Sequence, residues 1–432
     1  METVAVQPQR VEPLSSSMKQ LAIPEIAVKL ALGAKIGRSG DQGAIRFEGE
    51  EIRMHGADLD LAIEISKKVL EKTPRKITPG AVITMVGAAN KILSDKIFRP
   101  DSIRVLYYAV ESKASAFYRC IMPMYALNMS GKAVSQASVM RYGRESLNYD
   151  VIVLQIADSP SALEFMTALQ NEGKKVVYEI DDAFHKLEPW HPQFASYGQP
   201  ERHEAVKAMM RQADAVQVST QWLADEYRQY ARRIEVVPNM VELATWPPAE
   251  RARKDGLWKV LWAGSSSHSG DLQIVVPALA AFAKLHPNVR IVFFGQSPPG
   301  SDIPKEQIEV IDWCEFEEYP VKFSGVDADV AIAPLADVPF NYGKSNLRVL
   351  QCWASKYPVI ASNVGPYAEA IRHGSDGLLC EEGGWLASLE KTYQNEDLCK
   401  RFIDAGLERA KEFDVRPNIK RILSFYSSLT EK

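Results

Sequence analysis

The sequence predicts an α/β protein with two doubly wound halves that face a cleft, preceded by a mainly helical N-terminal extension. From residue 101 onward, short apolar runs alternate with helix-like segments; the alternation stops at a Pro- and charge-rich break, 246–255, and then restarts. Such alternation is typical of a parallel sheet covered by helices on both faces. A chain of 432 residues also exceeds the size at which one hydrophobic core keeps growing, so we expect two domains.

The composition is that of a globular protein. Hydrophobic residues make up 46% of the chain and charged residues 25%, which excludes disorder for most of it. The net charge of −4 gives no global reason to bind nucleic acid. The five cysteines are widely spaced without a C-x-x-C pair, which favours a reducing compartment. Without a bilayer-spanning apolar run or a signal-peptide pattern, we expect a cytoplasmic protein with at most peripheral membrane contact.

The first hundred residues divide into two parts. Residues 1–18 are polar, contain Pro and Ser and lack periodicity, so we expect a disordered tail. Residues 19–100 form an extension with helical patterning, in which 57–70 and 79–91 are the expected helices. This extension could contribute either to acceptor specificity or to assembly. Its lysines are open to two interpretations, a solvated helical face or a basic surface for a nucleic acid.

The two halves are predicted over 101–245 and 246–415, and a C-terminal helix is predicted over 416–432. Crossing back to the first half is one path open to this helix. The expected strands are short apolar runs of the buried kind. In the first half they are 103–110, 149–156, 176–180, 215–218 and 234–237, and in the second half 259–263, 289–294, 308–311, 330–333, 359–361 and 377–379. Helices are expected between them, for example over 162–172 and 202–213.

Polar residues follow several of these strands, where parallel sheets bind ligands. Asp181 and Asp182 follow the run 176–180. Paired carboxylates at a strand end can hold a cation, accept sugar hydroxyls or act as a general base. The alternative is that Asp182 caps the following helix.

The loop after 259–263 is rich in Gly and Ser and is a candidate phosphate cradle. His268 in this loop can donate to a phosphate or polarise a leaving oxygen. The alternatives are a structural histidine and, for Asp271, a helix cap.

The segment 340–351 reads as a polar loop that enters a helix. Gly343, Lys344 and Ser345 there present backbone N–H groups together with a cation, as a phosphate or diphosphate requires. The alternative is an ordinary N-cap by Ser345 or Asn346.

These residues fall into ordered motifs of a known family. In chain order the motifs are Tyr118-Arg119 with Pro123, Glu179-Ile180-Asp181-Asp182, Ser219-Thr220 with Val237-Pro238-Asn239, Gly264 to Leu272, and Phe340 to Gln351. On these motifs, residues 103–413 resemble a GT-B glycosyltransferase of the large, mostly retaining group 1 family. The order of several motifs is more specific than any one of them.

The resemblance implies two Rossmann-like domains, the first binding the acceptor and the second the donor. It implies a nucleotide-diphosphate sugar as donor substrate, and neither a metal nor a permanently bound cofactor. The implied donor-binding residues are Gly264, Ser265, Ser266, Asn341, Lys344, Ser345, Asn346, Arg348, Gln351, Gly365 and Tyr367.

Two positions depart from the family pattern. Relatives carry Glu at the position of Gln351, where the carboxylate accepts from both ribose hydroxyls, whereas an amide has one acceptor oxygen. The upstream acid of the family's pair falls at Gly343, so sugar recognition must come from elsewhere, with Asn341 and Asp337 as candidates.

For mechanism, the resemblance implies a retaining, metal-independent transfer of a sugar to an acceptor hydroxyl. Lys344 and the helix start, helped by His268, would stabilise the leaving diphosphate. Asp181 or Asp182 would face the acceptor, as general base if the reaction inverts.

The resemblance also places Tyr118, Arg119 and Asn239 on the acceptor side, with Arg119 as a phosphate or acceptor anchor. The acceptor itself is unknown: a glycan, a lipid-linked glycan or a modified nucleic-acid base. An inactive binding or regulatory protein of the same fold and a sugar-nucleotide epimerase stay open as alternatives. The oligomeric state is not predicted.

Overall fold

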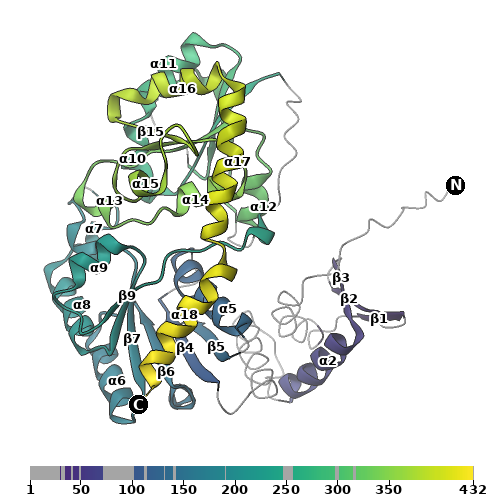
Figure 1. Ribbon diagram of the computed structural model, residues 1–432, viewed down its shortest axis with the longest axis vertical. Helices are drawn as coiled ribbons and strands as arrows, with labels where there is room; N and C mark the ends of the chain where they lie inside the picture. The colour runs from purple at the N-terminus through teal and green to yellow at the C-terminus, as the bar shows by residue number, and fades with distance from the viewer. Residues whose placement is uncertain are drawn as a thin grey trace. The chain divides into compact units, whose positions relative to one another are not determined.

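The structure is a computed structural model with two compact units, Met1–Ser102 and Ile103–Lys432 (Figure 1). It describes residues 30, 35–39, 42–47, 50–71, 102–110, 114–130, 132–139, 143–189, 191–246, 256–296, 301–314 and 318–431. The expected tail over 1–18 and the expected helix over 79–91 lie outside the described residues. Among the described residues, no helix combines the length and the apolar character needed to cross a bilayer.

The described part of the first unit is a three-stranded antiparallel sheet followed by a helix. Its elements are β1 (Lys35–Ser39), β2 (Gln42–Phe47), β3 (Glu50–His55) and α2 (Gly56–Leu70). Helix α2 confirms the helix expected over 57–70 and buries Ala62, Ile65 and Val69. The expectation of a mainly helical extension is wrong over 35–55.

Two short hairpins explain this miss. Ser39 pairs with Gln42 and Phe47 with Glu50, so two residues join each pair of strands. Both connections contain a glycine, Gly40 in one and Gly49 in the other, which is the hairpin signal. The strands themselves are polar and lack a strong alternation, so hydrophobic periodicity alone does not find them.

The second unit begins with a six-stranded parallel sheet, ordered β5-β4-β6-β7-β8-β9. Its strands are β4 (Ile103–Ala109), β5 (Ala133–Val139), β6 (Val151–Gln155), β7 (Lys175–Ile180), β8 (Ala215–Val218) and β9 (Ile234–Val236). All five expected strands are confirmed. Strand β5 was not expected, because it lies at the sheet edge and its sequence, AVSQASV, has small and polar residues in place of a buried apolar run.

Helices connect the strands of this first sheet. They are α4 (Ala114–Ala116), the π-helix η1 (Phe117–Ile121), α5 (Met122–Met129), α6 (Pro160–Asn171), α7 (Phe194–Tyr197), α8 (Pro200–Gln212) and α9 (Gln221–Tyr227), with short 3-10 turns η2 (Arg144–Asn148) and η3 (Phe184–Lys186). Along β4, Val105 and Tyr107 face one apolar cluster whereas Leu106 and Tyr108 face another, so both faces of the sheet are buried.

A second six-stranded parallel sheet follows, ordered β12-β11-β10-β13-β14-β15. Its strands are β10 (Trp258–Ala263), β11 (Val289–Phe294), β12 (Ile308–Ile311), β13 (Val330–Ala333), β14 (Val359–Ser362) and β15 (Leu378–Cys380), and all six were expected. Its helices include α10 (Ser269–Gln273), α11 (Val276–Leu285), α12 (Tyr319–Ser324), α13 (Pro339–Tyr342), α14 (Leu347–Ala354), α15 (Gly365–Ala370) and α16 (Trp385–Tyr393).

The chain ends with two helices, α17 (Glu396–Glu412) and α18 (Val415–Thr430), drawn in yellow in Figure 1. Helix α18 packs on the first sheet and α5. The ring of Tyr426 lies 5.9 Å from that of Tyr107, and its hydroxyl donates to Gln217 Oε1 at 2.6 Å. The end of the chain thus covers the first half.

Candidate functional site

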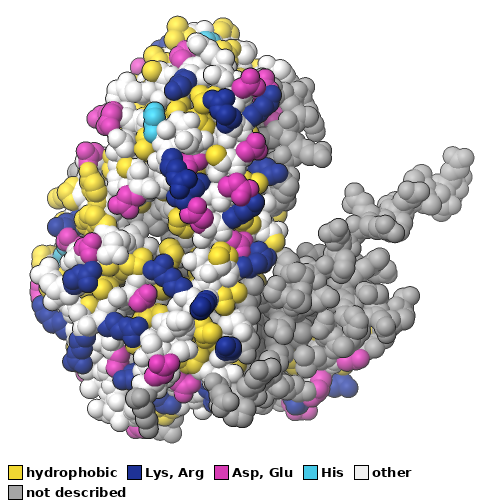
Figure 2. Space-filling model, in the orientation of Figure 1, with side chains coloured by type: hydrophobic (Ala, Val, Ile, Leu, Met, Phe, Trp, Pro, Cys, Tyr) yellow, Lys and Arg dark blue, Asp and Glu magenta, His cyan; other side chains and the backbone are white. Residues whose placement is uncertain are grey.

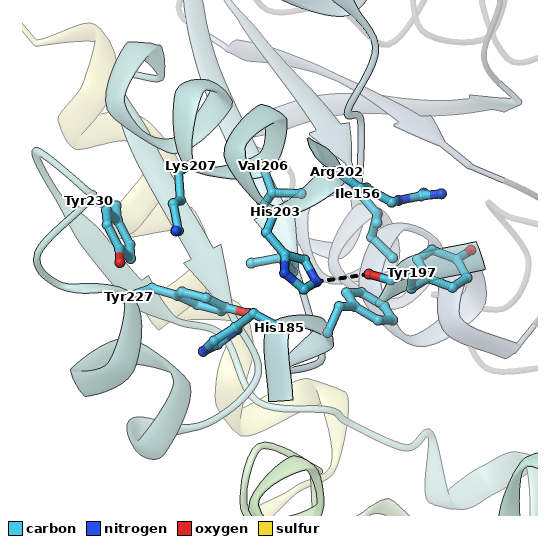
Figure 3. A pocket seen from close by; sticks show the side chains of 11 residues that line it. Ile156, His185, Tyr197, Arg202, His203, Val206, Lys207, Tyr227 and Tyr230 are labelled. Carbon is cyan, nitrogen blue, oxygen red and sulfur yellow. Dashed lines mark hydrogen bonds between the residues drawn. The ribbon is translucent and has the colours of Figure 1, made fainter. Parts of the chain in front are cut away.

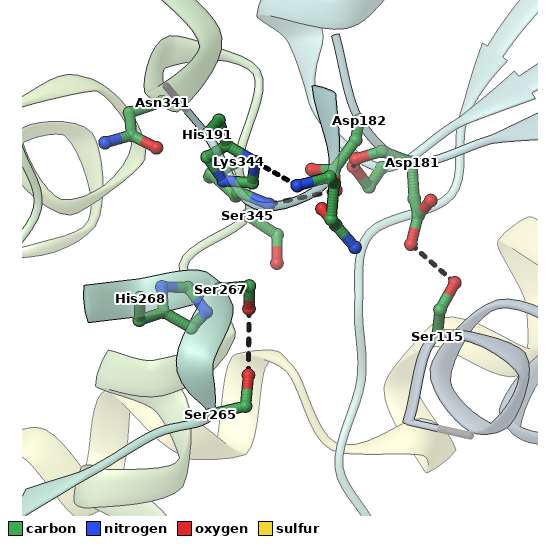
Figure 4. A network of polar contacts seen from close by, with 12 residues as sticks. Ser115, Asp181, Asp182, His191, Ser265, Ser267, His268, Asn341, Lys344 and Ser345 are labelled. Atoms are coloured by element: carbon green, nitrogen blue, oxygen red, sulfur yellow. Dashed lines mark hydrogen bonds and ion pairs between the residues drawn. The ribbon is translucent and has the colours of Figure 1, made fainter. Parts of the chain in front are cut away.

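The motif that contains Asp182, in the first half, contacts the motif that contains Lys344, in the second half (Figure 4). Asp182 follows β7 in the first half, and Lys344 lies between α13 and α14 in the second. The Lys344 Nζ atom donates to Asp182 Oδ2 at 2.9 Å, and about a fifth of each side chain is exposed. Lys344 Nζ also lies 4.3 Å from the centre of the Phe340 ring. The ammonium group is thus held between an aromatic face and a carboxylate.

Gly343 allows this close approach of the halves. A Cβ atom at this position would lie 2.8 Å from Ala183 Cβ and 3.1 Å from Leu223 Cδ2. Contacts shorter than 3.0 Å essentially do not occur for real Cβ atoms, so a larger residue would force the halves apart. Close packing against Ala183 and Leu223 thus explains why this chain has a glycine at position 343.

The first turn of α14 has the features of an anion-binding helix start. Asn346 at the N-cap makes no side-chain capping hydrogen bond. Ser345 Oγ lies a long 3.4 Å from the Leu347 amide, and it accepts a shorter bond of 2.8 Å from Asn239 Nδ2. The simple N-cap interpretation is therefore poorly supported, and the backbone donors can serve an anion.

Three acids and two cations share the buried strand end. Arg119 Nε donates to Glu179 Oε1 at 2.5 Å, and neither side chain has exposed surface. Burial raises the pKa of Glu179 to about 8 against the opposing effect of Arg119. Burial likewise raises the pKa of Asp182 to about 6, opposed by Lys344 and reinforced by Asp181. Both acids therefore bind protons more readily than in water, chiefly because burial disfavours their charged forms.

Arg119 does not reach solvent, so the expectation that it anchors a phosphate or an acceptor directly is wrong. Its Nη1 atom donates to the Val237 carbonyl at 2.6 Å and to Asn239 Oδ1 at 2.9 Å. Through Asn239 the guanidinium is connected to Ser345 of the second half. Arg119 therefore positions the strand ends around it.

Asp181 turns away from Lys344. Its Oδ2 atom accepts from Ser115 Oγ at 2.9 Å, and Ser115 Oγ accepts from Gln155 Nε2 at 2.9 Å (Figure 4). Its Oδ1 atom is buried and has no hydrogen-bond partner among the described residues. A buried acceptor without a partner is costly in a protein interior.

The Gly- and Ser-rich loop lies at the end of β10. Asp271 does not cap α10, whose N-cap residue is His268, so the cap interpretation is wrong. Instead Asp271 Oδ2 lies 2.9 Å from His268 Nδ1, and its Oδ1 accepts from Asn341 and from the Ala336 amide. Ser265 Oγ lies 2.8 Å from Ser267 Oγ, and the Ser266 side chain lies outside the described part of the loop.

The remaining expected donor residues surround α14. Gln351 Nε2 donates to Tyr118 Oη at 3.0 Å, a contact between the halves. Arg348 Nη1 would lie 3.1 Å from a Cβ atom at Gly264, so this arginine reaches the β10 loop. Tyr367 is buried, and the nearby charge of Arg348 opposes the rise that burial causes in its pKa.

Gly365 has a φ of +47°, a conformation that L side chains rarely adopt. A Cβ there would lie 3.2 Å from Tyr342 Cα. This glycine lets the start of α15 approach the end of α13.

His191 belongs to the site, and sequence reasoning missed it. It lies beyond η3 in the first half and is 8% exposed. Its ring lies 5.1 Å from that of Phe340, in the second half. No motif marks this histidine, because its role depends on how the halves meet.

A small hollow lies in the first half (Figure 3). Aromatic and basic side chains line it, among them Tyr197, His203, Lys207 and Tyr230. Tyr227 on its wall donates to the Asp182 carbonyl at 2.9 Å. The hollow offers about 20 Å³ to a water-sized molecule, room for about one water. Among the described residues, no group of three His, Cys, Asp or Glu is placed to hold a metal ion.

Comparisons with known proteins find a family match within the second half of the chain. Residues 259–395 match the sequence model of the family "Glycosyl transferases group 1". A glycogen synthase of Mycobacterium tuberculosis is 22% identical over 228 residues, 49% of this chain and 53% of that protein. A D-inositol 3-phosphate glycosyltransferase of Pseudarthrobacter chlorophenolicus is 28% identical over 185 residues, 38% of this chain and 42% of that protein. The chain thus spans about half the length of the curated relatives it matches.

Solved structures share the fold over a larger part of the chain. Anabaena HepE in complex with UDP-glucose superposes with a TM-score of 0.57 at 16% identity, over 76% of this chain and all of that chain. A sucrose-phosphate synthase of Thermosynechococcus elongatus gives a TM-score of 0.59 at 15% identity, over 76% and 99% of the two chains. At such identities the likeness shows the fold, which is the two-domain GT-B fold.

Proposed function

We propose that this protein transfers a sugar from a nucleotide-diphosphate sugar to an acceptor hydroxyl, because residues 259–395 match the family model "Glycosyl transferases group 1" and the chain has the GT-B fold. One observation carries the proposal. Lys344, just before α14, donates to Asp182, the second of the two aspartates that follow β7, so the proposed phosphate site and the proposed acceptor side are joined by one hydrogen bond.

The donor diphosphate would bind at the start of α14. The backbone donors at 345–347, the Ser345 hydroxyl and Lys344 together supply the positive field that a diphosphate needs. Lys344 would exchange its contact with Asp182 for a phosphate oxygen. The β10 loop approaches the same position, because Arg348 of α14 reaches Gly264.

Gln351 is suited to a ribose hydroxyl despite the missing acid. Its Nε2 atom donates to Tyr118, which leaves the amide oxygen to accept. We propose weaker ribose binding than a carboxylate would give, because the amide lacks charge and a second acceptor atom. The same substitution is what favours the alternative function, a sugar-nucleotide binding protein without transfer.

The leaving diphosphate would be stabilised by Lys344 and the α14 N-terminus, which gain most as negative charge develops. We propose a retaining transfer that draws on these groups. Asp181, with its unpartnered buried Oδ1, would accept a hydrogen bond from the acceptor hydroxyl, and would serve as general base if the reaction inverts.

The acceptor is proposed to be a glycan or a lipid-linked glycan. On the face of the second unit drawn in Figure 2, basic and acidic side chains are interspersed, in contrast to the basic stripe typical of nucleic-acid binding. On α2, Lys68 lies 3.4 Å from Glu64 one turn earlier, which supports a solvated helical face there.

The test is release of nucleoside diphosphate by the purified protein from UDP-, GDP- and dTDP-sugars, with glycan acceptors and without. Lys344→Ala is expected to abolish release. Lys400→Ala is the matched control, because Lys400 lies on α17 and pairs only with acids of its own helix among the described residues. Equal activity of the Lys344 variant and the control would contradict the proposed site.

A further inference from the structure

We propose that His268 recognises the transferred sugar by accepting a hydrogen bond from one of its hydroxyls at Nε2, rather than by donating to the diphosphate. This inference rests on the proposed function and concerns the same site. It assigns one determinant of donor-sugar specificity, in a chain where the family's usual acid position is occupied by Gly343.

Asp271 determines which nitrogen of His268 carries the proton. Its Oδ1 atom accepts from the Ala336 amide at 2.9 Å and from Asn341 Nδ2 at 2.8 Å, and its Oδ2 atom lies 2.9 Å from His268 Nδ1. Burial alone would raise the pKa of Asp271, but the hydrogen bond and charge of His268, with those two donors, hold it below its usual value. A carboxylate only accepts, so Nδ1 must carry the proton.

The other ring nitrogen is therefore an acceptor. Burial, reinforced by the charge of Arg348, lowers the pKa of His268 to about 4, so the imidazole is neutral at neutral pH. The side chain is 23% exposed, and no described residue hydrogen-bonds its Nε2 atom. A lone pair repels the unprotonated oxygens of a diphosphate diester, whereas a hydroxyl can donate to it.

The position of His268 favours the sugar over the ribose. His268 is joined through Asp271 to Asn341, on α13, whereas the proposed ribose contact is Gln351, in the second turn of α14. In Figure 4, His268 and Asn341 lie on one side of Lys344, and Asp181 lies on the other. A sugar bound between them meets the second half at His268 and the acceptor-side acid at Asp181.

The first test reads the tautomer directly. Long-range ¹H–¹⁵N correlation of the full chain with ¹⁵N-labelled histidine, the His268 signals being identified by their loss in His268→Gln, should show a protonated Nδ1 and an unprotonated Nε2. A protonated Nε2 at neutral pH would overturn the inference.

The second test separates sugar from nucleotide. Calorimetric titration is run with UDP-glucose, UDP-N-acetylglucosamine and GDP-mannose, and with UDP and GDP. For the nucleotide sugar that binds tightest, His268→Phe should weaken binding about tenfold, as expected when a hydrogen bond is removed and a polar group is left unpaired, while its nucleoside diphosphate changes less than twofold. His268→Gln, whose amide oxygen accepts, should recover part of the loss.

His286→Phe is the matched control. His286 forms the same kind of pair, with Nε2 2.7 Å from Glu390 Oε1, and this pair joins the end of α11 to α16 of the same half. It should leave both affinities unchanged. Equal loss of nucleoside diphosphate and nucleotide sugar in His268→Phe, or no loss at all, would overturn the inference while leaving the proposed function standing. Failure of the unmodified protein to bind any of the five compounds would refute both.

Discussion

The substitution Asp182→Asn should make the protein bind its nucleotide sugar more tightly. Asp182 Oδ2 lies 2.9 Å from Lys344 Nζ, so a diphosphate at the proposed site would have to compete with the carboxylate for the ammonium group. Asparagine keeps the shape and an acceptor oxygen but removes the charge. Removal of an acid next to an anion site then strengthens anion binding, which is the opposite of what a purely structural role for Asp182 would give.

The size of the effect follows from the hydrogen bond that the substitution weakens. A hydrogen bond to a charged group contributes about 1.5–3 kcal/mol, and one between neutral groups about 0.5–1.5 kcal/mol. Replacement of the carboxylate by an amide therefore weakens the hydrogen bond to Lys344 by about 1 kcal/mol. The dissociation constant of the nucleotide sugar should fall about fivefold. Both side chains are about one-fifth exposed, so solvent screens the ion pair only in part.

The dependence on pH provides a second readout. Because the pKa of Asp182 is raised to about 6, the acid becomes protonated below that pH and releases Lys344. Affinity of the unmodified protein should rise as the pH falls from 7 to 5, and this rise should vanish in Asp182→Asn. A nucleotide sugar is the proper ligand for this calorimetric titration, because its diphosphate diester lacks the terminal phosphate that titrates near pH 6. Weaker binding by Asp182→Asn, or an unchanged pH dependence, would refute the reasoning.

Three other substitutions test neighbouring contacts. Gly343→Ala should lower the unfolding free energy by about 1–3 kcal/mol and weaken donor binding together, because its methyl group would overlap Ala183; a melting temperature equal to that of the unmodified protein would argue against the close contact. Gln351→Glu should tighten nucleoside diphosphate binding several-fold in calorimetry through a second ribose acceptor, and weaker binding would remove Gln351 from the ribose site. Since burial raises the pKa of Glu179 from 4.5 to about 8, the folded state binds more protons over that interval, and the unfolding free energy should fall as the pH rises through it. Glu179→Gln should flatten this dependence in urea titrations, and an unaltered slope would contradict the assignment.

Much of the fold is predictable because buried parallel strands are nearly continuous apolar runs. Strands β7 and β11, with sequences KVVYEI and VRIVFF, are examples. Strand β5 escapes this logic because an edge strand can be polar, and β1 to β3 escape it because their signal lies in glycine-containing connections. The local hydrophobic pattern therefore identifies strands that are buried on both faces. It misses strands that are held mainly by hydrogen bonding to a neighbouring strand.

The site was predictable to the level of loops. Parallel strands place Asp182, the β10 loop and Lys344 at strand ends, and motif order identified them. Pairing across the halves was not predictable, since no local rule connects Lys344 with Asp182 or His191 with Phe340. The same limit misassigned Arg119, whose complete burial depends on residues far away in sequence.

Nucleoside diphosphate release tests the central claim most directly. The unmodified protein is incubated with a panel of nucleotide sugars and glycan acceptors, beside Lys344→Ala and Lys400→Ala. The account predicts acceptor-dependent release from at least one nucleotide sugar, retained in the Lys400 variant and abolished in the Lys344 variant. Absence of release from every donor with every acceptor, or equal release by the two variants, would contradict it.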